Sequence, residues 1–179
     1  RFARNIPAVF GLAILVLVMG AAFFAPAIYP QGPFEMVGRP FLEPLTDYLL
    51  GTDQLGRDLG VGLLYGARVT LQIGLISTLI AIFLGLTIGG TAGYFGGWID
   101  TLLMRITEIF QTIPFFLFAI LLVAILKPTL GSVIFAIAVV SWPPMARLVR
   151  SEFLSIRNRE FVQACIVMGM WHWQIIFKH

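Results

Sequence analysis

The stretch TLIAIFLGLTIGGTAGYFGG (residues 78–97) contains no Asp, Glu, Lys or Arg in twenty positions. A run of about 18 or more uncharged, mostly apolar residues is long enough to cross the hydrocarbon core of a membrane as a helix. Small residues recur in it at every fourth position, on one helix face: Ala81, Gly85, Gly89, Gly93 and Gly97. Glycine is common in membrane helices, but five small residues in register favour close approach of a second helix. The stretch therefore predicts a packed membrane helix.

The rest of the chain has the same character, because 59% of its 179 residues are hydrophobic and only 12% are charged. Four runs contain no charged residue: residues 6–28, 69–99, 109–126 and 129–146. We expect transmembrane helices at residues 6–28, about 69–97, 105–126 and 129–149. The first run is too long for the apolar region of a signal peptide and is interpreted as an anchor. The predicted fold class is an all-α, polytopic membrane helical bundle.

The positive charges indicate the orientation of these spans. Alternating spans place eight Arg and Lys residues on one side: Arg1, Arg4, Arg105, Arg147, Arg150, Arg157, Arg159 and Lys178. The other side has four: Arg39, Arg57, Arg68 and Lys127. The positive-inside rule makes the first side cytoplasmic. Residues 1–5 are then a cytoplasmic N-terminal remnant, and residues 29–68 form an external (periplasmic) loop.

Other classes of function lack support in the sequence. A net charge of +3 is weak evidence for nucleic-acid binding, and the single cysteine, Cys165, provides neither a disulfide nor a metal cluster. We find no phosphate-binding G-x-x-x-x-G-K-[ST] loop, no G-x-S-x-G motif and no carboxylate inside the four uncharged runs. We therefore expect that the chain is not an enzyme, and we assign no metal ligand.

The external loop contains LGTDQLGRDLGVGLLYGARV (residues 50–69). Thr52 or Asp53 can cap a helix here, and Leu55, Leu59 and Leu63 recur at a spacing of four. The pattern predicts an amphipathic helix at the outer surface, before the second span.

Prolines interrupt the later spans. Breaks or kinks are expected at Pro114, Pro143 and Pro144, because proline removes a backbone hydrogen bond. Polar side chains lie near these positions: Gln111, Thr112 and Ser141. They either line a transport pathway or restore the hydrogen bonding that proline disturbs, and the sequence does not separate these alternatives. Arg147 and Arg150 are expected to reach anionic lipid head groups.

The chain ends in REFVQACIVMGMWHWQIIFKH (residues 159–179). Phe161, Ala164 or Cys165, and Met168 fall at i, i+3 or i+4, and i+7, which is typical of an amphipathic helix. Gly169 then predicts a bend before a second helix begins. The segment is either a docking helix for a partner protein or a helix lying on the lipid surface, and these two readings are nearly equal on physical grounds.

The same segment resembles the cytoplasmic loop of binding-protein-dependent ABC importer permeases, with the pattern Glu-Ala-Ala, three residues, Gly. Gln163, Ala164, Cys165 and Gly169 fall on this pattern, with Gln163 at the acidic position and Cys165 at the second alanine. LGTDQLGRD, YGARVTL, GYFGGWIDTLLMR and ARLVRSEFLSIRNREFVQA resemble, in order, the branch of that family that imports dipeptides, oligopeptides or nickel.

The resemblance implies a type I ABC importer permease-like fold with six spans, of which four are present here. Residues 69–179 would be a truncated permease core ending in a cytoplasmic coupling segment at residues 155–179. The implied location is the bacterial inner membrane. The implied partners are a sibling permease subunit, cytoplasmic ATPase subunits that hold ATP and Mg²⁺, and an extracytoplasmic solute-binding protein that delivers a short peptide.

The resemblance also implies roles for particular residues. Coupling to an ATPase subunit would involve Glu160, Phe161, Gln163, Ala164, Cys165, Met168 and Gly169, with Phe161, Cys165 and Met168 as the stripe buried in the ATPase groove. Asp53, Arg57 and Asp58 would support the outer gate or contact the binding protein, or act only as a helix cap and a solvated pair. The alternative function is a structural or assembly membrane subunit with a lipid-surface amphipathic tail.

Overall fold

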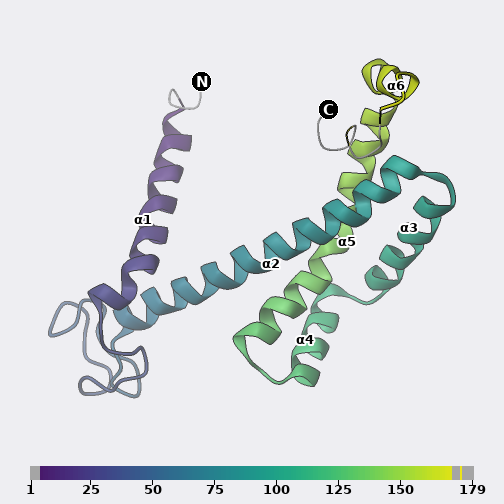
Figure 1. The fold of residues 1–179 in the computed structure, drawn as a ribbon. Helices are drawn as coiled ribbons and strands as arrows, with labels where there is room; N and C mark the ends of the chain where they lie inside the picture. Colours follow the sequence, from purple (N-terminus) through teal and green to yellow (C-terminus); the bar gives the residue numbers. More distant parts are fainter. Residues whose placement is uncertain (1–4, 171–173, 175–179) are drawn as a thin grey trace. The chain divides into compact units, whose positions relative to one another are not determined.

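The computed structural model describes residues 5–170 and 174, and over these residues the chain is helical, with two isolated bridge pairs and no longer strand (Figure 1). The helices in chain order are α1 (Ile6–Ile28), α2 (Leu59–Phe95), α3 (Gly97–Thr112), α4 (Phe115–Leu126), α5 (Leu130–Arg157) and α6 (Glu160–Val167). The predicted all-α class is confirmed. Within the coupling segment predicted at residues 155–179, residues 171–173 and 175–179 lie outside the described residues.

The chain divides into two compact units, Arg1–Ile73 and Gly74–His179. The first contains α1, the loop at residues 29–58 and the beginning of α2. The second contains the remainder of α2 and the helices α3 to α6.

Three helices in the described part of the chain are long and apolar enough to cross a membrane: α1, α2 and α5. A fourth span exists if α3 and α4 are counted together, although an 82° bend separates them. The sequence predicted one kinked helix at Pro114, whereas the structure has two helices that meet at Ile113 and Pro114. Proline offers no amide to continue α3 and restrains the residue before it to extended geometry, so the chain turns before α4 begins.

The amphipathic helix predicted within residues 50–69 is not a separate element, because residues 59–69 are the beginning of α2 and residues 50–58 are not helical. Helix α2 starts at Leu59 and continues for 37 residues, about 55 Å, so it is much longer than a hydrocarbon core requires. Neither Thr52 nor Asp53 caps it. The carboxylate of Asp58 accepts hydrogen bonds from the amides of Gly60 (2.7 Å) and Val61 (3.4 Å) and is the cap.

Helix α5 is continuous through Pro143 and Pro144, so it does not break there, and the kink expected as the alternative stays a prediction. Two prolines leave the carbonyls one turn earlier without their usual donors, but the remaining helical hydrogen bonds on both sides maintain the helix. Transmembrane helices tolerate proline because unpaired backbone is more costly in lipid than a locally weakened helix. Pro143 is also buried, next in sequence to buried Trp142.

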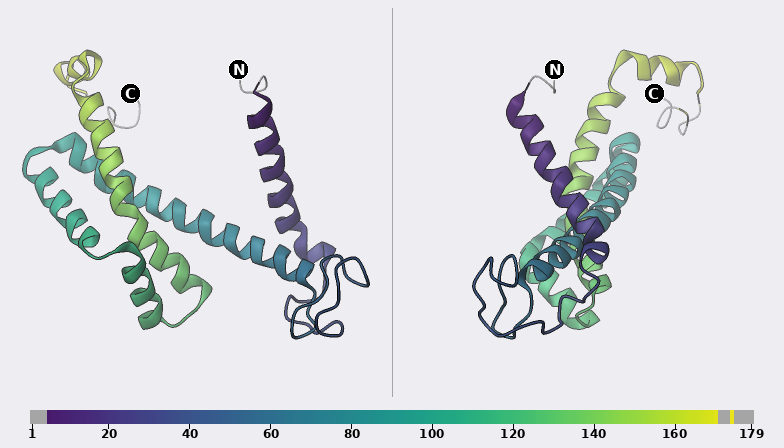
Figure 2. Two further views of the ribbon diagram at one scale, coloured as in Figure 1. Left: turned by 180° about the vertical axis from the view of Figure 1, so that it is seen from behind. Right: turned by 90° about the vertical axis from the view of Figure 1, so that its left-hand side faces the viewer.

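The small residues of α2 pack closely against α5 within the second unit, where the two helices cross (Figure 2). A Cβ atom on Gly85 would lie 2.6 Å from Cγ of Met145, and one on Gly89 would overlap the carbonyl of Ala146. Ala81 is buried in a cluster with Trp142 and Ala146. Phe110 of α3 stacks edge-on against Trp142, with ring centroids 5.3 Å apart.

Gly93 continues this contact, because a Cβ atom there would lie 2.6 Å from Cβ of Phe153 on α5. Gly97 does not take part. It begins α3 after the turn at Gly96, and a Cβ atom there would meet nothing within 4 Å. The fourfold spacing continues through the sequence, but helix α2 ends at Phe95, so the spacing no longer defines one face.

Candidate functional site

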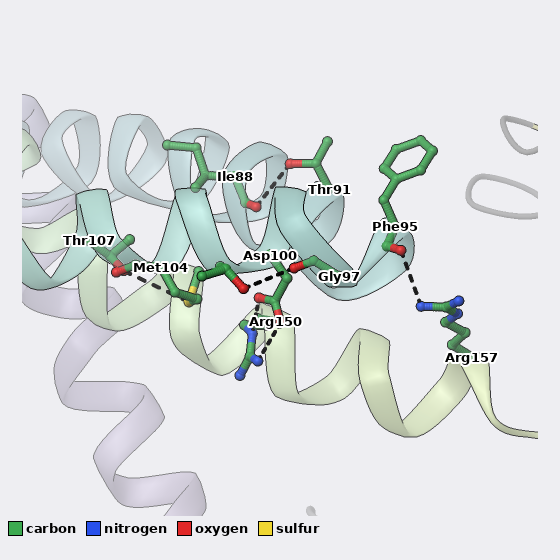
Figure 3. Close-up of polar contacts among 10 residues, drawn as sticks. Ile88, Thr91, Phe95, Gly97, Asp100, Met104, Thr107, Arg150 and Arg157 are labelled. Carbon is green, nitrogen blue, oxygen red and sulfur yellow. Dashed lines mark hydrogen bonds and ion pairs between the residues drawn. The ribbon is translucent and has the colours of Figure 1, made fainter.

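The candidate site lies where α2, α3, α5 and α6 meet at one end of the second unit. Figure 3 shows the contacts among α2, α3 and α5. Asp100 lies in the first turn of α3 and faces Arg150 of α5. The guanidinium of Arg150 donates two hydrogen bonds to the Asp100 carboxylate, Nε to Oδ1 and Nη2 to Oδ2, the second at 2.6 Å. Both side chains are part-buried, with 33% of the Arg150 side chain and 16% of the Asp100 side chain exposed. This ion pair was not predicted from the sequence, where we expected Arg150 to reach lipid head groups.

Two further hydrogen bonds connect the end of α5 with its neighbours. Arg157 donates from Nη1 to the carbonyl of Phe95 at the end of α2, at 3.4 Å (Figure 3). Gln163 of α6 donates from Nε2 to the carbonyl of Arg157, at 3.1 Å. The amide of Gln163 therefore satisfies a carbonyl at the end of α5, which has no partner within its own helix.

The inner face of α6 is apolar and packs on the same chain. Val162 (3% exposed) and Cys165 (6% exposed) form a buried cluster with Tyr94 of α2, against which Phe153 and Met170 pack. The predicted buried stripe was Phe161, Cys165 and Met168. The structure buries Cys165 within this chain, together with Val162, so Cys165 is not free for a partner. Phe161 and Met168 are exposed, and their burial in an ATPase groove stays a prediction.

The outer face of α6 is exposed and contains apolar side chains. Phe161 is 44% exposed, Met168 is 70% exposed, and Val167, Ala164 and Glu160 are exposed as well. Gly169 has a φ of +75°, and the amide of Met170 donates to the carbonyl of Cys165 at 3.1 Å. This is the Schellman geometry that ends a helix at glycine, and it accounts for the bend expected at this position.

The predicted pathway residues are placed as follows. Gln111 and Ser141 are half-buried, and Thr112 is exposed, with its hydroxyl donating to the carbonyl of Glu108 at 3.0 Å. An open apolar cavity of about 600 Å³ lies between α4 and α5, and none of these three residues lines it. For Thr112 the structure therefore favours local hydrogen bonding near the bend; the pathway role stays a prediction for all three.

The external candidates act mainly as braces of the loop in the first unit. Asp53 accepts hydrogen bonds from the amides of Leu55 (2.7 Å) and Arg57 (2.9 Å), and Asp58 caps α2. The amide of Arg57 is the main cause that lowers the pKa of the Asp53 carboxyl below its ordinary value. The guanidinium of Arg57 lies 5.4 Å from the ring centroid of Phe34, in a cation–π contact. The carboxylates of Asp53 and Asp58 both already accept hydrogen bonds from backbone amides of the same chain.

The amino-acid sequence was compared with known proteins. Residues 81–179 match the family described as "Binding-protein-dependent transport system inner membrane component", and residues 1–44 match the "N-terminal TM domain of oligopeptide transport permease C". The dipeptide transport system permease protein DppC of Alkalihalophilus pseudofirmus is 40% identical over the whole chain, which covers 59% of that relative. DppC of Bacillus subtilis is 38% identical, with 56% of it covered.

An oligopeptide relative is equally similar. The oligopeptide transport system permease protein OppC of Haemophilus influenzae is 38% identical over the whole chain, which covers 58% of it. The chain thus spans somewhat less than three fifths of the length of these curated relatives.

Proposed function

Because the chain belongs to the family of inner membrane components of binding-protein-dependent transport systems, we propose that it is the membrane-spanning permease subunit of an ATP-driven importer of dipeptides or oligopeptides. The similarity to dipeptide and oligopeptide permeases over the whole chain supports the solute class. The subunit forms the translocation pathway with a sibling permease subunit. It receives its solute from an extracytoplasmic solute-binding protein.

The proposed orientation places the loop at residues 29–58 outside and α6 in the cytoplasm, as the excess of Arg and Lys predicts. Cytoplasmic ATPase subunits, which hold ATP and Mg²⁺, then meet α6. This chain supplies no catalytic group in the proposal. Its task is to convert movement of the ATPase subunits into movement of its spans.

The geometry of α6 is the observation that carries this proposal. Its inner face, Val162 and Cys165, is fixed to Tyr94 of the same chain, whereas Phe161 on the outer face is exposed, as is Met168 directly after the helix. A helix that is packed on its inner face against its own chain and has apolar side chains on its outer face can bind in a groove of a partner protein. Because the inner face is already buried, only the outer side chains remain as anchors for an ATPase subunit.

The same contacts define a mechanical route from α6 to the spans. A pull on α6 reaches α2 through the Tyr94 cluster and α5 through the hydrogen bond of Gln163 to the carbonyl of Arg157. Helix α5 then transmits the pull to α3 through the ion pair of Arg150 and Asp100. This route does not require a break at Pro143 and Pro144, where α5 is one continuous helix.

The experiment compares outer and inner face variants in the full-length, assembled complex. Phe161→Ser combined with Met168→Ser is expected to abolish ATP-dependent peptide uptake and to weaken co-purification of the ATPase subunits. Loss of an aromatic anchor from such an interface costs about 2 kcal/mol or more. The matched inner-face variant Val162→Ala is expected to lower thermal stability instead. Normal uptake and normal ATPase co-purification in the double variant would refute the coupling role of α6.

The alternative, a structural or assembly subunit whose α6 lies on lipid, is supported by the same exposed apolar side chains. It predicts that no ATPase subunit co-purifies with the wild-type complex, and that the double variant weakens only the association of α6 with the membrane surface.

A further inference from the structure

The loop at residues 29–58 is a fixed structure braced by buried polar groups. Thr52 is almost fully buried, and its hydroxyl donates to the carbonyl of Arg39 (2.6 Å) while accepting from the amide of Leu42 (2.9 Å). The hydroxyl of Tyr48 donates to the carbonyl of Val37, also at 2.6 Å. These bonds join positions 10 to 13 residues apart, so they hold residues 37–52 of the loop together.

Two apolar residues of this loop are held in a costly backbone conformation and still point into solvent. Phe41 has a φ of +57° and Leu45 a φ of +65°, a region that residues with a Cβ atom rarely adopt. Their exposed fractions are 75% and 80%. Neither residue gains burial within the chain in return for the strain. Strain of this kind, maintained by the surrounding structure, is typical of segments that bind something.

The surroundings indicate what would cover the 41–47 segment. Within the first unit the loop lies beyond the C-terminal end of α1 and the N-terminal end of α2 (Figures 1 and 2), and the proposed orientation places it outside the membrane. Glu43 and Asp47 are exposed between and beside Phe41 and Leu45. Residues 31–58 contain five acidic and two basic residues, a net charge of −3. Anionic head groups would repel such a segment.

We propose that the 41–47 segment is a docking surface for a soluble extracytoplasmic protein whose contact face has apolar pockets for Phe41 and Leu45 and a rim of Lys and Arg. Apolar anchors among charged residues are typical of interfaces that form and dissociate, and charge complementarity accelerates association. The inference rests on the proposed function in one respect: in an importer this partner is the solute-binding protein.

The test uses the full complex in lipid nanodiscs and its purified solute-binding protein. Phe41→Gly combined with Leu45→Gly removes both side chains, and glycine adopts the same φ without strain, so the brace of the loop remains. We expect the dissociation constant to rise at least tenfold. Gln54→Ala is the matched control, because it removes an exposed side chain of the same loop outside the segment. Glu43→Lys combined with Asp47→Lys is expected to slow association and to remove its dependence on salt.

An unchanged dissociation constant in the glycine variant would overturn the inference, as would loss of the sibling subunit from the complex, which would make the segment a permanent subunit interface. Weaker membrane retention with unchanged binding would overturn it in favour of lipid. These outcomes differ from failure of the proposed function, in which the wild-type complex binds no ATPase subunit and takes up no peptide.

Discussion

Asp100 and Arg150 lie 50 positions apart in the chain, yet the carboxylate of the first accepts two hydrogen bonds from the guanidinium of the second. The pair connects the first turn of α3 to α5, beside the close contact of Gly93 with Phe153. A carboxylate in the first turn of a helix is also favoured by the helix dipole. The start of the bent α3–α4 pair is therefore tied to α5 at the same end of the unit as α6.

Removal of one charge of this pair should destabilise the second unit. Asp100→Asn leaves the part-buried guanidinium of Arg150 without its counter-charge, at an expected cost of about 1–2 kcal/mol. Thermal unfolding of the purified complex measures the effect. Arg105→Gln is the control, because Arg105 and Glu108 form an exposed pair whose loss should cost less than about 1 kcal/mol. Equal melting temperatures for both variants would contradict a structural role for the buried pair.

Enlargement of Gly89 should disrupt the contact of α2 with α5. A Cβ atom there overlaps the carbonyl of Ala146, and backbone cannot move aside as a flexible side chain can. Gly89→Val should therefore destabilise the unit by about 1–3 kcal/mol and lower the yield of assembled complex. Gly74→Ala on the same helix meets nothing within 4 Å and should be neutral or slightly stabilising. Equal stability of the two variants in denaturation would contradict a close contact of α2 with α5 at Gly89.

The orientation of the chain can be tested by thiol labelling, but not at Cys165. Its thiol is buried on the inner face of α6, against Tyr94, so it should react slowly with a membrane-impermeant maleimide from either side. A cysteine at the exposed position Met168, introduced together with Cys165→Ala, is the suitable probe. We expect rapid labelling in inside-out vesicles stripped of the ATPase subunits, which would otherwise cover this position, and none in intact cells. Labelling of intact cells would reverse the proposed topology.

The external loop should loosen only in strong acid. The pKa of Asp53 is lowered chiefly because its carboxylate accepts a hydrogen bond from the amide of Arg57, so its contribution is complete above the ordinary pKa of 3.8 and is lost as pH falls through the lowered value. Pepsin cleavage within residues 29–58 should stay slow at pH 4 and accelerate at lower pH. Asp53→Ala should be cleaved rapidly at both pH values. Identical acid sensitivity in the two proteins would exclude this role.

The range of the first helix was predictable to the residue, because uncharged residues 6–28 continue from the cap at Asn5 to the prolines near Pro30 and nothing competes with helix formation. The start of α2 was not. Thr52, Asp53 and Asp58 are all acceptable caps by residue type, and the choice depended on Thr52 being occupied by Arg39 and Leu42 across the loop. Bonds over such separations leave no periodic signal.

The candidate site was predictable in outline but not in its contacts. The mixed pattern after Arg159 indicated a short amphipathic helix, and the glycine that ends it could be recognised. Which apolar side chains face inward depended on the position of Tyr94, far away in the sequence. Arg150 was assigned to lipid because its partner lies on another helix. The strained Phe41 and Leu45 had no signal at all, because their φ angles follow from the brace around them.

By itself, the sequence determined the properties that depend on composition and local spacing: a helical membrane protein, its apolar runs, the small-residue face of α2 from Ala81 to Gly93, and the family to which it belongs. Transfer of uncharged helix into lipid is favourable whatever the neighbours are, so these properties can be read from one segment at a time. Tertiary structure alone decided that α5 continues through Pro143 and Pro144, that Asp100 pairs with Arg150, and that Cys165 faces inward while Phe161 stays exposed. Each of these depends on the free energy of contacts between distant segments, and that energy exists only once the helices have packed.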